Sequence, residues 1–303
     1  MKGQQSQNLH RLMWLANVQQ FFSDKAPTQL WNDYSTWLNN RNLFQQLYQR
    51  YPLNELYDID FSSRDQQLSQ GILITFHFGP YRLLPKILVR CGYKITLLAA
   101  TNILKREAEY YSRELREAGL PSEMLECIDA NHPYALRKIL SAVNEKRLIL
   151  VFLDANEGQQ PNDANHDDRL PVPFAAHYFL WRINILKLAA RFKIPLYCSY
   201  MQPSRELIPW TVRPFESIMT NDEHTAEDAM MRAFSRLQLV FQQMMKQGWI
   251  YWENWAFIHQ YHTALADGNM GITAAGSWLL PLEYQQEKYL FDIKNRQFFK
   301  IKG

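Results

Sequence analysis

These 303 residues contain few cysteines and no long apolar run, two features that often indicate a functional class. The three cysteines, Cys91, Cys127 and Cys198, are far apart and form no metal-spaced pair. Each lies in or beside an apolar segment, which fits reduced thiols in a cytosolic protein. No uninterrupted apolar run of about 18 residues is present, so no membrane-spanning helix is expected. The opening residues 1–8 are polar, unlike a secretory signal peptide.

The chain also has little excess of positive over negative charge. The formal net charge is only +3, and basic residues form neither a run of five nor a dense stripe along a helix. Nucleic acid is therefore not expected as a partner. Hydrophobic residues make up 47% of the chain, which is enough for a sizeable core and argues against disorder. We expect a cytoplasmic protein, and a peripheral contact with the inner face of the cytoplasmic membrane stays open.

The order of the apolar segments predicts an α/β fold. Short apolar runs predict strands at 72–76, 94–100, 148–153, 195–201 and 210–215. A further strand is expected at 123–128, because the alternation of strands and helices requires one there. Apolar residues at helical spacing predict helices at 81–90, 104–118, 133–144, 178–192 and 225–247. This alternation favours a mostly parallel sheet with helices on its faces.

The two ends of the chain differ from this central pattern. Helices are predicted over 10–22 and 31–51, and their polar faces carry Gln and Asn, so packing is favoured over docking to anionic lipid. A tail over 289–301 predicts a β-hairpin, whose role as sheet extension, dimer arm or carrier-docking element stays open. We expect one domain over 1–262, with a helical N-terminal cover over 1–60, and a C-terminal extension over 263–303.

The most informative stretch is Gly-Ile-Leu-Ile-Thr-Phe-His-Phe-Gly-Pro-Tyr-Arg at residues 71–82. A predicted buried strand ends at His77, Gly79 follows two residues later, and a predicted helix begins at once. His77 therefore stands at the carboxyl end of a strand, where open α/β sheets bind ligands. A histidine there can take a proton from a hydroxyl or an amine near neutral pH. A capped or core histidine is the alternative on position alone.

Residues 73–84 resemble the histidine block of the lysophospholipid acyltransferase superfamily, and most closely the branch of bacterial lipid A biosynthesis (lauroyl/myristoyl) acyltransferases. His77, Phe78 and Gly79 match the family's His-Phe-Gly. Further blocks keep the family's order: a strand ending in Asp at 147–154, a short apolar loop at 170–174, a helix end and strand at 189–201, and a Trp-rich segment at 248–262. The resemblance covers roughly residues 30–262. It departs at Arg82, where the motif has an acid, and at the polar N-terminus, where these relatives have an apolar anchor.

The resemblance implies an acyltransferase-like fold that transfers an acyl chain from an acyl carrier protein or acyl-CoA to a hydroxyl or amine of a lipid or small-molecule acceptor. The acyl thioester is then a co-substrate, and no cofactor is expected. In the family the histidine acts as general base, and the acid five residues later orients the imidazole. Arg82 cannot do this, because a guanidinium near His77 lowers the pKa of the imidazole.

Three explanations of Arg82 stay open. The orienting acid comes from elsewhere in the fold, with Asp154, Glu157 and Glu253 as candidates. Alternatively, His77 acts alone on a more nucleophilic acceptor, or the site is catalytically degenerate and binds a lipid, an acyl chain or an acyl carrier protein. Asp154 is the first candidate, since it ends a buried strand expected to run parallel to the strand before His77. A helix or loop cap is its alternative role.

Substrate contacts are expected from residues near these motifs, namely Gly79, Arg82, Glu157, Arg169 and Phe174. Arg82 suits an anion such as the phosphate of a pantetheine arm, and Arg169 and Arg182 are weaker candidates. A solvated arginine in the first turn of a helix is the alternative.

Other chemistries have less support in the sequence. His166 stands among three aspartates in a polar stretch over 155–170 that predicts a long loop, and adjacent acids in such a loop usually only solvate it, so no metal is predicted. His259 and His262 follow an aromatic run more typical of a core or an interface than of a site. No Gly-x-Ser-x-Gly elbow is present, which disfavours a serine hydrolase.

Overall fold

The predicted α/β class is confirmed in a computed structural model, which describes residues 2–55, 70–154, 169–175, 177–203, 210–219, 225–258, 262–263, 278–284 and 287–301. A six-stranded sheet lies at the centre, in the order β10-β7-β1-β4-β2-β3. Its strands are β1 (Gly71–Thr75), β2 (Ile95–Ala99), β3 (Leu125–Asp129), β4 (Leu148–Phe152), β7 (Leu196–Cys198) and β10 (Glu216–Met219). All neighbours are parallel except the edge strand β10, which pairs antiparallel with β7.

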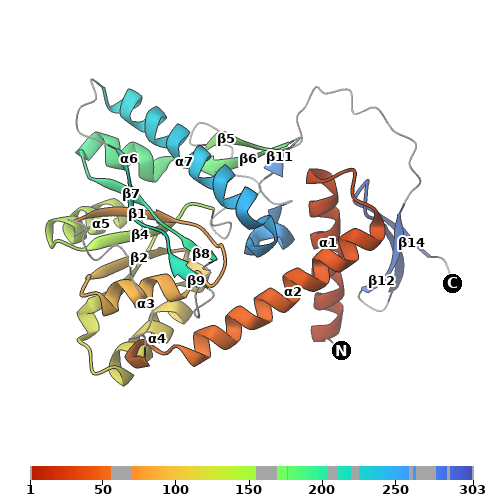
Figure 1. Cartoon of the computed structure of the whole chain (residues 1–303), viewed down its shortest axis with the longest axis horizontal. Coiled ribbons are helices and arrows are strands. Elements are labelled where there is room, and N and C mark those ends of the chain that lie inside the picture. The colour runs from red at the N-terminus through yellow and green to blue at the C-terminus, as the bar shows by residue number, and fades with distance from the viewer. Residues whose placement is uncertain are drawn as a thin grey trace.

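Helices on both faces explain the apolar strands of this sheet. α3 (Leu83–Arg90) and α4 (Thr101–Glu117) lie on one side, whereas α6 (Asn184–Phe192) and α7 (Ala226–Gly248) lie on the other (Figure 1). α5 (Ala135–Asn144) connects β3 to β4. Every residue of β1 is buried, as expected of a central strand covered on both faces.

The chain between β4 and β7 differs from its prediction. The helix predicted over 178–192 is wrong in its first part, where the structure has β6 (His177–Arg182) before α6. In β6 buried and half-buried side chains alternate, which is the period of a strand. The apolar loop expected at 170–174 is instead β5 (Arg169–Phe174), which pairs antiparallel with β6. β5 is an edge strand in the order β11-β6-β5, and edge strands tolerate prolines such as Pro171 and Pro173.

Short elements complete this part of the fold. β11 (His262–Thr263) pairs with β6, and the single strand predicted over 195–201 is divided into β7 and β8 (Met201–Pro203). β8 pairs antiparallel with β9 (Trp210–Val212). Two 3₁₀ helices, η4 (Trp249–Tyr251) and η5 (Glu253–Ala256), follow α7. Earlier in the described part of the chain are the 3₁₀ helices η1 (Leu53–Glu55) and η2 (Ser122–Met124).

The N-terminal helices α1 (Lys2–Phe21) and α2 (Pro27–Arg50) pack on η4 and η5, and α1 also packs on a C-terminal sheet (Figure 1). That sheet contains β12 (Leu279–Tyr284), β13 (Glu287–Asp292) and β14 (Gln297–Lys300), so β12 adds a strand to the predicted hairpin. Asn17 of α1 joins both neighbours, because its amide donates to Trp255 O at 2.6 Å and accepts from Arg296 at 2.7 Å. Among the helices of the described residues, none combines the length and apolarity needed to cross a membrane.

Candidate active site

The register of β1 and β4 brings the two predicted catalytic side chains together. Thr75 stands opposite Phe152 in the parallel pair, and the chain continues by two residues beyond each to His77 and Asp154. His77 Nδ1 lies 2.9 Å from Asp154 Oδ1. The connections after β1 and β4 also leave in opposite directions, toward β2 and β7. This is the kind of switch point at which open α/β sheets bind ligands.

Asp154 is held in a single orientation by donors from three residues. Its side chain is fully buried, and its two carboxylate oxygens accept the His77 backbone N–H at 3.1 and 3.0 Å. Trp252 Nε1 donates to Oδ2 at 2.7 Å, and Asn254 Nδ2 donates to the same oxygen at 3.2 Å. Since the ionised carboxylate only accepts, the Nδ1 of His77 carries the hydrogen of their bond, and its Nε2 presents a lone pair.

The surroundings of the imidazole tune its basicity. The His77 side chain is 21% exposed, and its ring lies 4.5 Å from Phe152 and 4.8 Å from Tyr81 between centroids. Burial lowers the pKa of His77, but the Asp154 carboxylate raises it by charge and hydrogen bond, with a smaller contribution from Glu253, so the pKa lies above its ordinary value. The lowering expected from Arg82 is present but is outweighed. The ring is therefore a stronger base than a free histidine.

Arg82 is paired with a carboxylate of the neighbouring helix. It immediately precedes α3, and its Nη2 donates to Glu107 Oε1 on α4 at 2.7 Å. Its side chain is 25% exposed. The guanidinium is therefore not fully solvated. It also does not bind His77 Nδ1, because that atom bonds to Asp154. A role for Arg82 in holding a substrate anion stays a prediction.

A short antiparallel contact fixes the loop after β1. Gly79 N donates to Tyr251 O at 3.0 Å, Glu253 N donates to His77 O at 2.9 Å, and Phe78 forms a β-bridge with Trp252. Gly79 has a φ of +60°, which favours glycine. A Cβ at this position would also lie 2.3 Å from the Trp210 ring. The loop therefore requires glycine at position 79.

The remaining predicted residues are spread over the structure. Phe174 packs among Phe21, Phe179 and Trp255, in the aromatic cluster that also surrounds Trp252. Arg169 begins β5 opposite Arg182, at the other end of that strand. His262 is in β11. Outside the described residues lie Glu157, His166 with its neighbouring aspartates, and His259.

Two residues that hold the site, Trp252 and Asn254, were not identified as site residues from the sequence. Trp252 belongs to the aromatic run that is more typical of a core or an interface, and it is fully buried. Only its indole N–H, directed at Asp154, gives it a part in the site. Nothing in the local sequence distinguishes Asn254 from any other asparagine.

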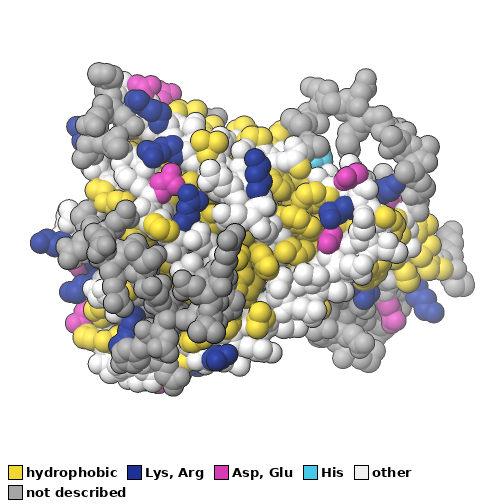
Figure 2. Space-filling model, in the orientation of Figure 1, with side chains coloured by type: hydrophobic (Ala, Val, Ile, Leu, Met, Phe, Trp, Pro, Cys, Tyr) yellow, Lys and Arg dark blue, Asp and Glu magenta, His cyan; other side chains and the backbone are white. Residues whose placement is uncertain are grey.

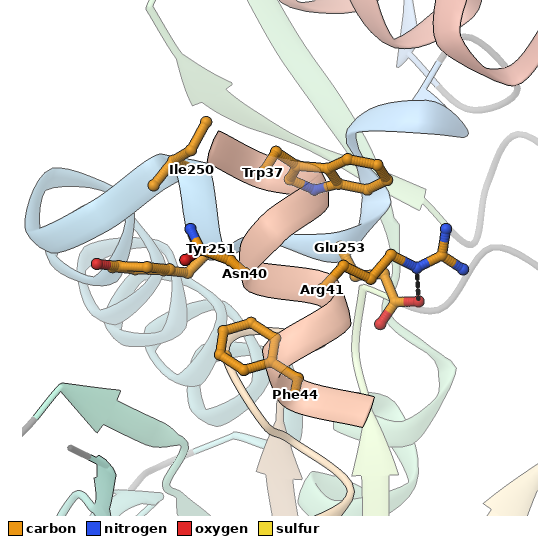
Figure 3. Close-up of a pocket in the computed structure, with 8 residues that line it drawn as sticks. Trp37, Asn40, Arg41, Phe44, Ile250, Tyr251 and Glu253 are labelled. Carbon is orange, nitrogen blue, oxygen red and sulfur yellow. Dashed lines mark ion pairs between the residues drawn. The ribbon is translucent and has the colours of Figure 1, made fainter. Parts of the chain in front are cut away.

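A shallow, open hollow lies where α2 meets the segment after α7 (Figure 3). Its lining comes from α2, from the loop after β1 and from the segment after α7: Trp37, Asn40, Arg41, Phe44, Gly79, Ile250, Tyr251 and Glu253. Neither His77 nor Asp154 lines this hollow, although Glu253, which does, donates its backbone N–H to His77 O. The arrangement places a histidine and its orienting carboxylate at one edge of the sheet.

Comparison with known proteins adds no family assignment. Neither the protein-family models nor the curated proteins include a match to this chain. The functional interpretation therefore depends on the geometry of the site and on the resemblance of the sequence motifs.

Proposed function

We propose that this protein is an acyltransferase that moves an acyl chain from a carrier-protein or CoA thioester to a hydroxyl or amine acceptor. His77 is the general base, and Asp154 positions its imidazole. The observation that carries the proposal is the 2.9 Å contact between His77 Nδ1 and the buried carboxylate of Asp154, at the carboxyl edge of the sheet. This contact favours the first of the three explanations of Arg82, in which the acid comes from elsewhere.

The dyad supplies what such a transfer needs. His77 Nε2 takes the proton of the acceptor as its oxygen or nitrogen attacks the thioester carbonyl, and the negative carboxylate stabilises the imidazolium that forms. The carbon–sulfur bond then breaks, and the imidazolium returns the proton to the leaving sulfur. The products are an ester or amide and a free thiol. A positioned general base contributes about 10²–10⁴-fold in rate.

Transfer of a labelled acyl group tests the proposal. Purified protein is incubated with acyl-CoA or acyl carrier protein and candidate acceptors, and His77→Gln is expected to lower the rate by about 10²–10⁴-fold. His132→Gln is the matched control, because His132 is an exposed histidine outside the site. An unchanged rate in His77→Gln would overturn the mechanism.

Arg82→Glu tests the alternative, a degenerate homologue that only binds a lipid, an acyl chain or an acyl carrier protein. This variant restores the acid of the family motif. It also places a carboxylate beside Glu107, whose side chain is 8% exposed and would keep only Arg106 of its two arginine partners. Because Asp154 already accepts from Nδ1, we expect a loss of stability and no gain of activity. A gain of transfer activity would instead support a decayed enzyme.

A further inference from the structure

Two aromatic rings pack against the imidazole of His77. Its centroid lies 4.8 Å from that of Tyr81 and 4.5 Å from that of Phe152. The Tyr81 and Phe152 rings also contact each other, at 5.4 Å between centroids. Tyr81 is steeply inclined to the imidazole, at an interplanar angle of 70°, which is one of the arrangements that aromatic pairs favour. The three rings therefore form one packed group at the ends of β1 and β4.

The hydroxyl of Tyr81 is itself fixed by two charged side chains. It forms side-chain hydrogen bonds with Arg82 and Glu253. Burial, and after it the charge of Glu253, raises the pKa of Tyr81, so the hydroxyl keeps its proton near neutral pH. It therefore donates to the Glu253 carboxylate, while its oxygen accepts from the Arg82 guanidinium. Hydrogen bonds to charged groups are stronger than those between neutral groups, so both contacts hold the ring in place.

Glu253 connects Tyr81 to the rest of the fold. Its backbone N–H donates to His77 O at 2.9 Å, so this residue contacts the backbone of His77 directly and the imidazole through Tyr81. Its carboxylate also forms an ion pair with Arg41 of α2, at 3.6 Å from Nε to Oε1 (Figure 3). Glu253 is thus held from α2 while it binds the hydroxyl of Tyr81.

The charged groups that act on the imidazole come from three parts of the chain. Asp154 follows β4, Glu253 begins η5, and Arg82 precedes α3. The two carboxylates raise the pKa of His77, whereas burial and Arg82 lower it. On the face shown in Figure 2, charged side chains of both signs are scattered over the surface, and salt screens such exposed charges over distance. A change of charge at Glu253 should therefore alter basicity, and loss of the Tyr81 ring should alter orientation.

We infer that Tyr81 is a positioning residue for His77, and that Glu253 holds Tyr81 in place. One hydrogen bond from Nδ1 to Asp154 leaves the imidazole free to tilt about the line from its Cβ to that nitrogen. The Tyr81 and Phe152 rings restrict this tilt, so Nε2 keeps one direction toward the acceptor. The effect on rate rests on the proposed acyl transfer, but the contacts themselves exist without any substrate.

Hydrogen exchange at His77 Nδ1 tests the positioning without substrate. NMR of isotope-labelled protein follows this hydrogen, whose signal is identified by its absence from His77→Gln. Tyr81→Leu should raise its exchange rate with water by about 2–10-fold, the preference that an aromatic pair contributes. Tyr81→Phe keeps the ring and should raise the exchange rate less. Tyr93→Leu is the matched control and should change nothing, because Tyr93 is also half-buried but packs on Phe215, before β2 rather than at the carboxyl end of a strand.

Rates of transfer separate positioning from basicity, with decanoyl-CoA as donor and the acceptor that the labelled transfer identifies. On the alkaline plateau, where His77 is unprotonated, Tyr81→Leu should lower kcat by about 10–100-fold, because a misplaced base reacts slowly. Glu253→Gln keeps an acceptor for the Tyr81 hydroxyl but removes the charge, so the acidic limb should move to lower pH. Glu253→Ala removes the acceptor and should lower the plateau as Tyr81→Phe does. The double variant Tyr81→Phe/Glu253→Ala should fall no further, because both changes remove one bond.

Each outcome decides for or against the inference. Faster exchange in Tyr81→Leu, together with a lower plateau, supports it. No protected Nδ1 hydrogen in the native protein, equal exchange in Tyr81→Leu, or an equal increase in Tyr93→Leu would overturn it, and additive losses in the double variant would overturn the role of Glu253. Faster exchange in Tyr81→Leu without any transfer by the native protein keeps the positioning of the ring and refutes the acyltransferase. Transfer that requires His77 but is unchanged in Tyr81→Leu does the reverse.

Discussion

Replacing Asp154 with asparagine changes the dyad with almost no change in shape. The two carboxylate oxygens accept hydrogen bonds from His77, Trp252 and Asn254 in a fully buried position. An amide offers one acceptor oxygen, and its NH₂ group must face at least one of these donors. The loss of a buried hydrogen bond is therefore expected to lower the free energy of unfolding by about 1–3 kcal/mol.

The effect on catalysis is expected to be larger than the effect on stability. If the amide NH₂ of Asp154→Asn donates to His77 Nδ1, the imidazole carries its hydrogen on Nε2, which is the atom that must accept the proton. The rate should then fall by about 10²–10⁴-fold. The variant also removes the main influence that raises the pKa of His77, so burial leaves that pKa lower than in the native protein. Since the base acts when it is unprotonated, the acidic limb of the rate profile should move to lower pH.

Two measurements check this reasoning. Initial rates of acyl transfer across pH give the loss of rate and the shift of the acidic limb, and NMR titration of the His77 ring follows its pKa without any substrate. Asp129→Asn is the matched control, because Asp129 ends β3 at the same edge of the sheet and bonds to Thr101 and Asn131 instead. An unchanged pKa of His77 in Asp154→Asn, or an unchanged rate, would refute the positioning role.

Three further predictions concern stability and are checked by urea unfolding. Burial lowers the pKa of His10 to about 4, so the unfolded state binds more protons and stability should fall as the pH decreases from 6.5 to 4, by about 1–3 kcal/mol for this partly exposed ring. His10→Phe should abolish this acid dependence, and its persistence would contradict the assignment. Gly79→Ala, with a φ of +60° and a Cβ 2.3 Å from the Trp210 ring, should destabilise by about 2–5 kcal/mol, and a neutral result would refute the clash. Lys86→Met leaves Glu114, 3.1 Å away, as a buried unpaired charge and should cost about 3–5 kcal/mol, most of which Lys86→Met/Glu114→Leu should restore; additive losses would disprove the coupling.

Elements whose own residues determine their structure could be predicted from the sequence. β1 and β4 are continuous apolar runs, because helices cover both faces of the sheet. The helix predicted over 225–247 is found one residue later at each end, as α7. The start of α7 can be predicted from the sequence, because Thr225 is a typical N-cap residue. Its hydroxyl accepts a hydrogen bond from Asp228 N at 3.1 Å.

Elements that depend on a distant partner could not be predicted in this way. The residues of β6 include several aromatics that fit either a strand or the start of α6, and only pairing with β5 decides between them. The prolines of β5 disfavour a strand locally, and they are tolerated because β5 pairs with a strand on one side only among the described residues. Both errors arise where tertiary pairing outweighs local preference.

The same distinction applies to the site. Asp154 was proposed because parallel strands end at one edge of a sheet, which is a rule that a sequence can use. The register that sets it 2.9 Å from His77 is a property of the folded sheet. Trp252 and Asn254 bind Asp154 from about a hundred residues further along the chain, so no local sequence pattern predicts these contacts.

The position of the acid explains how this chain can carry Arg82. A histidine at a strand end can be oriented by a carboxylate on the following helix or by one at the end of the neighbouring strand. Here the neighbouring strand provides it, fully buried and fixed by donors on both oxygens, so solvent screens its attraction to the imidazole little. Residue 82 is then not needed to orient the imidazole of His77 directly. The Arg82 guanidinium instead joins the start of α3 to Glu107 of α4. The missing motif acid therefore does not by itself indicate an inactive site, because the contact that it would provide is made from Asp154.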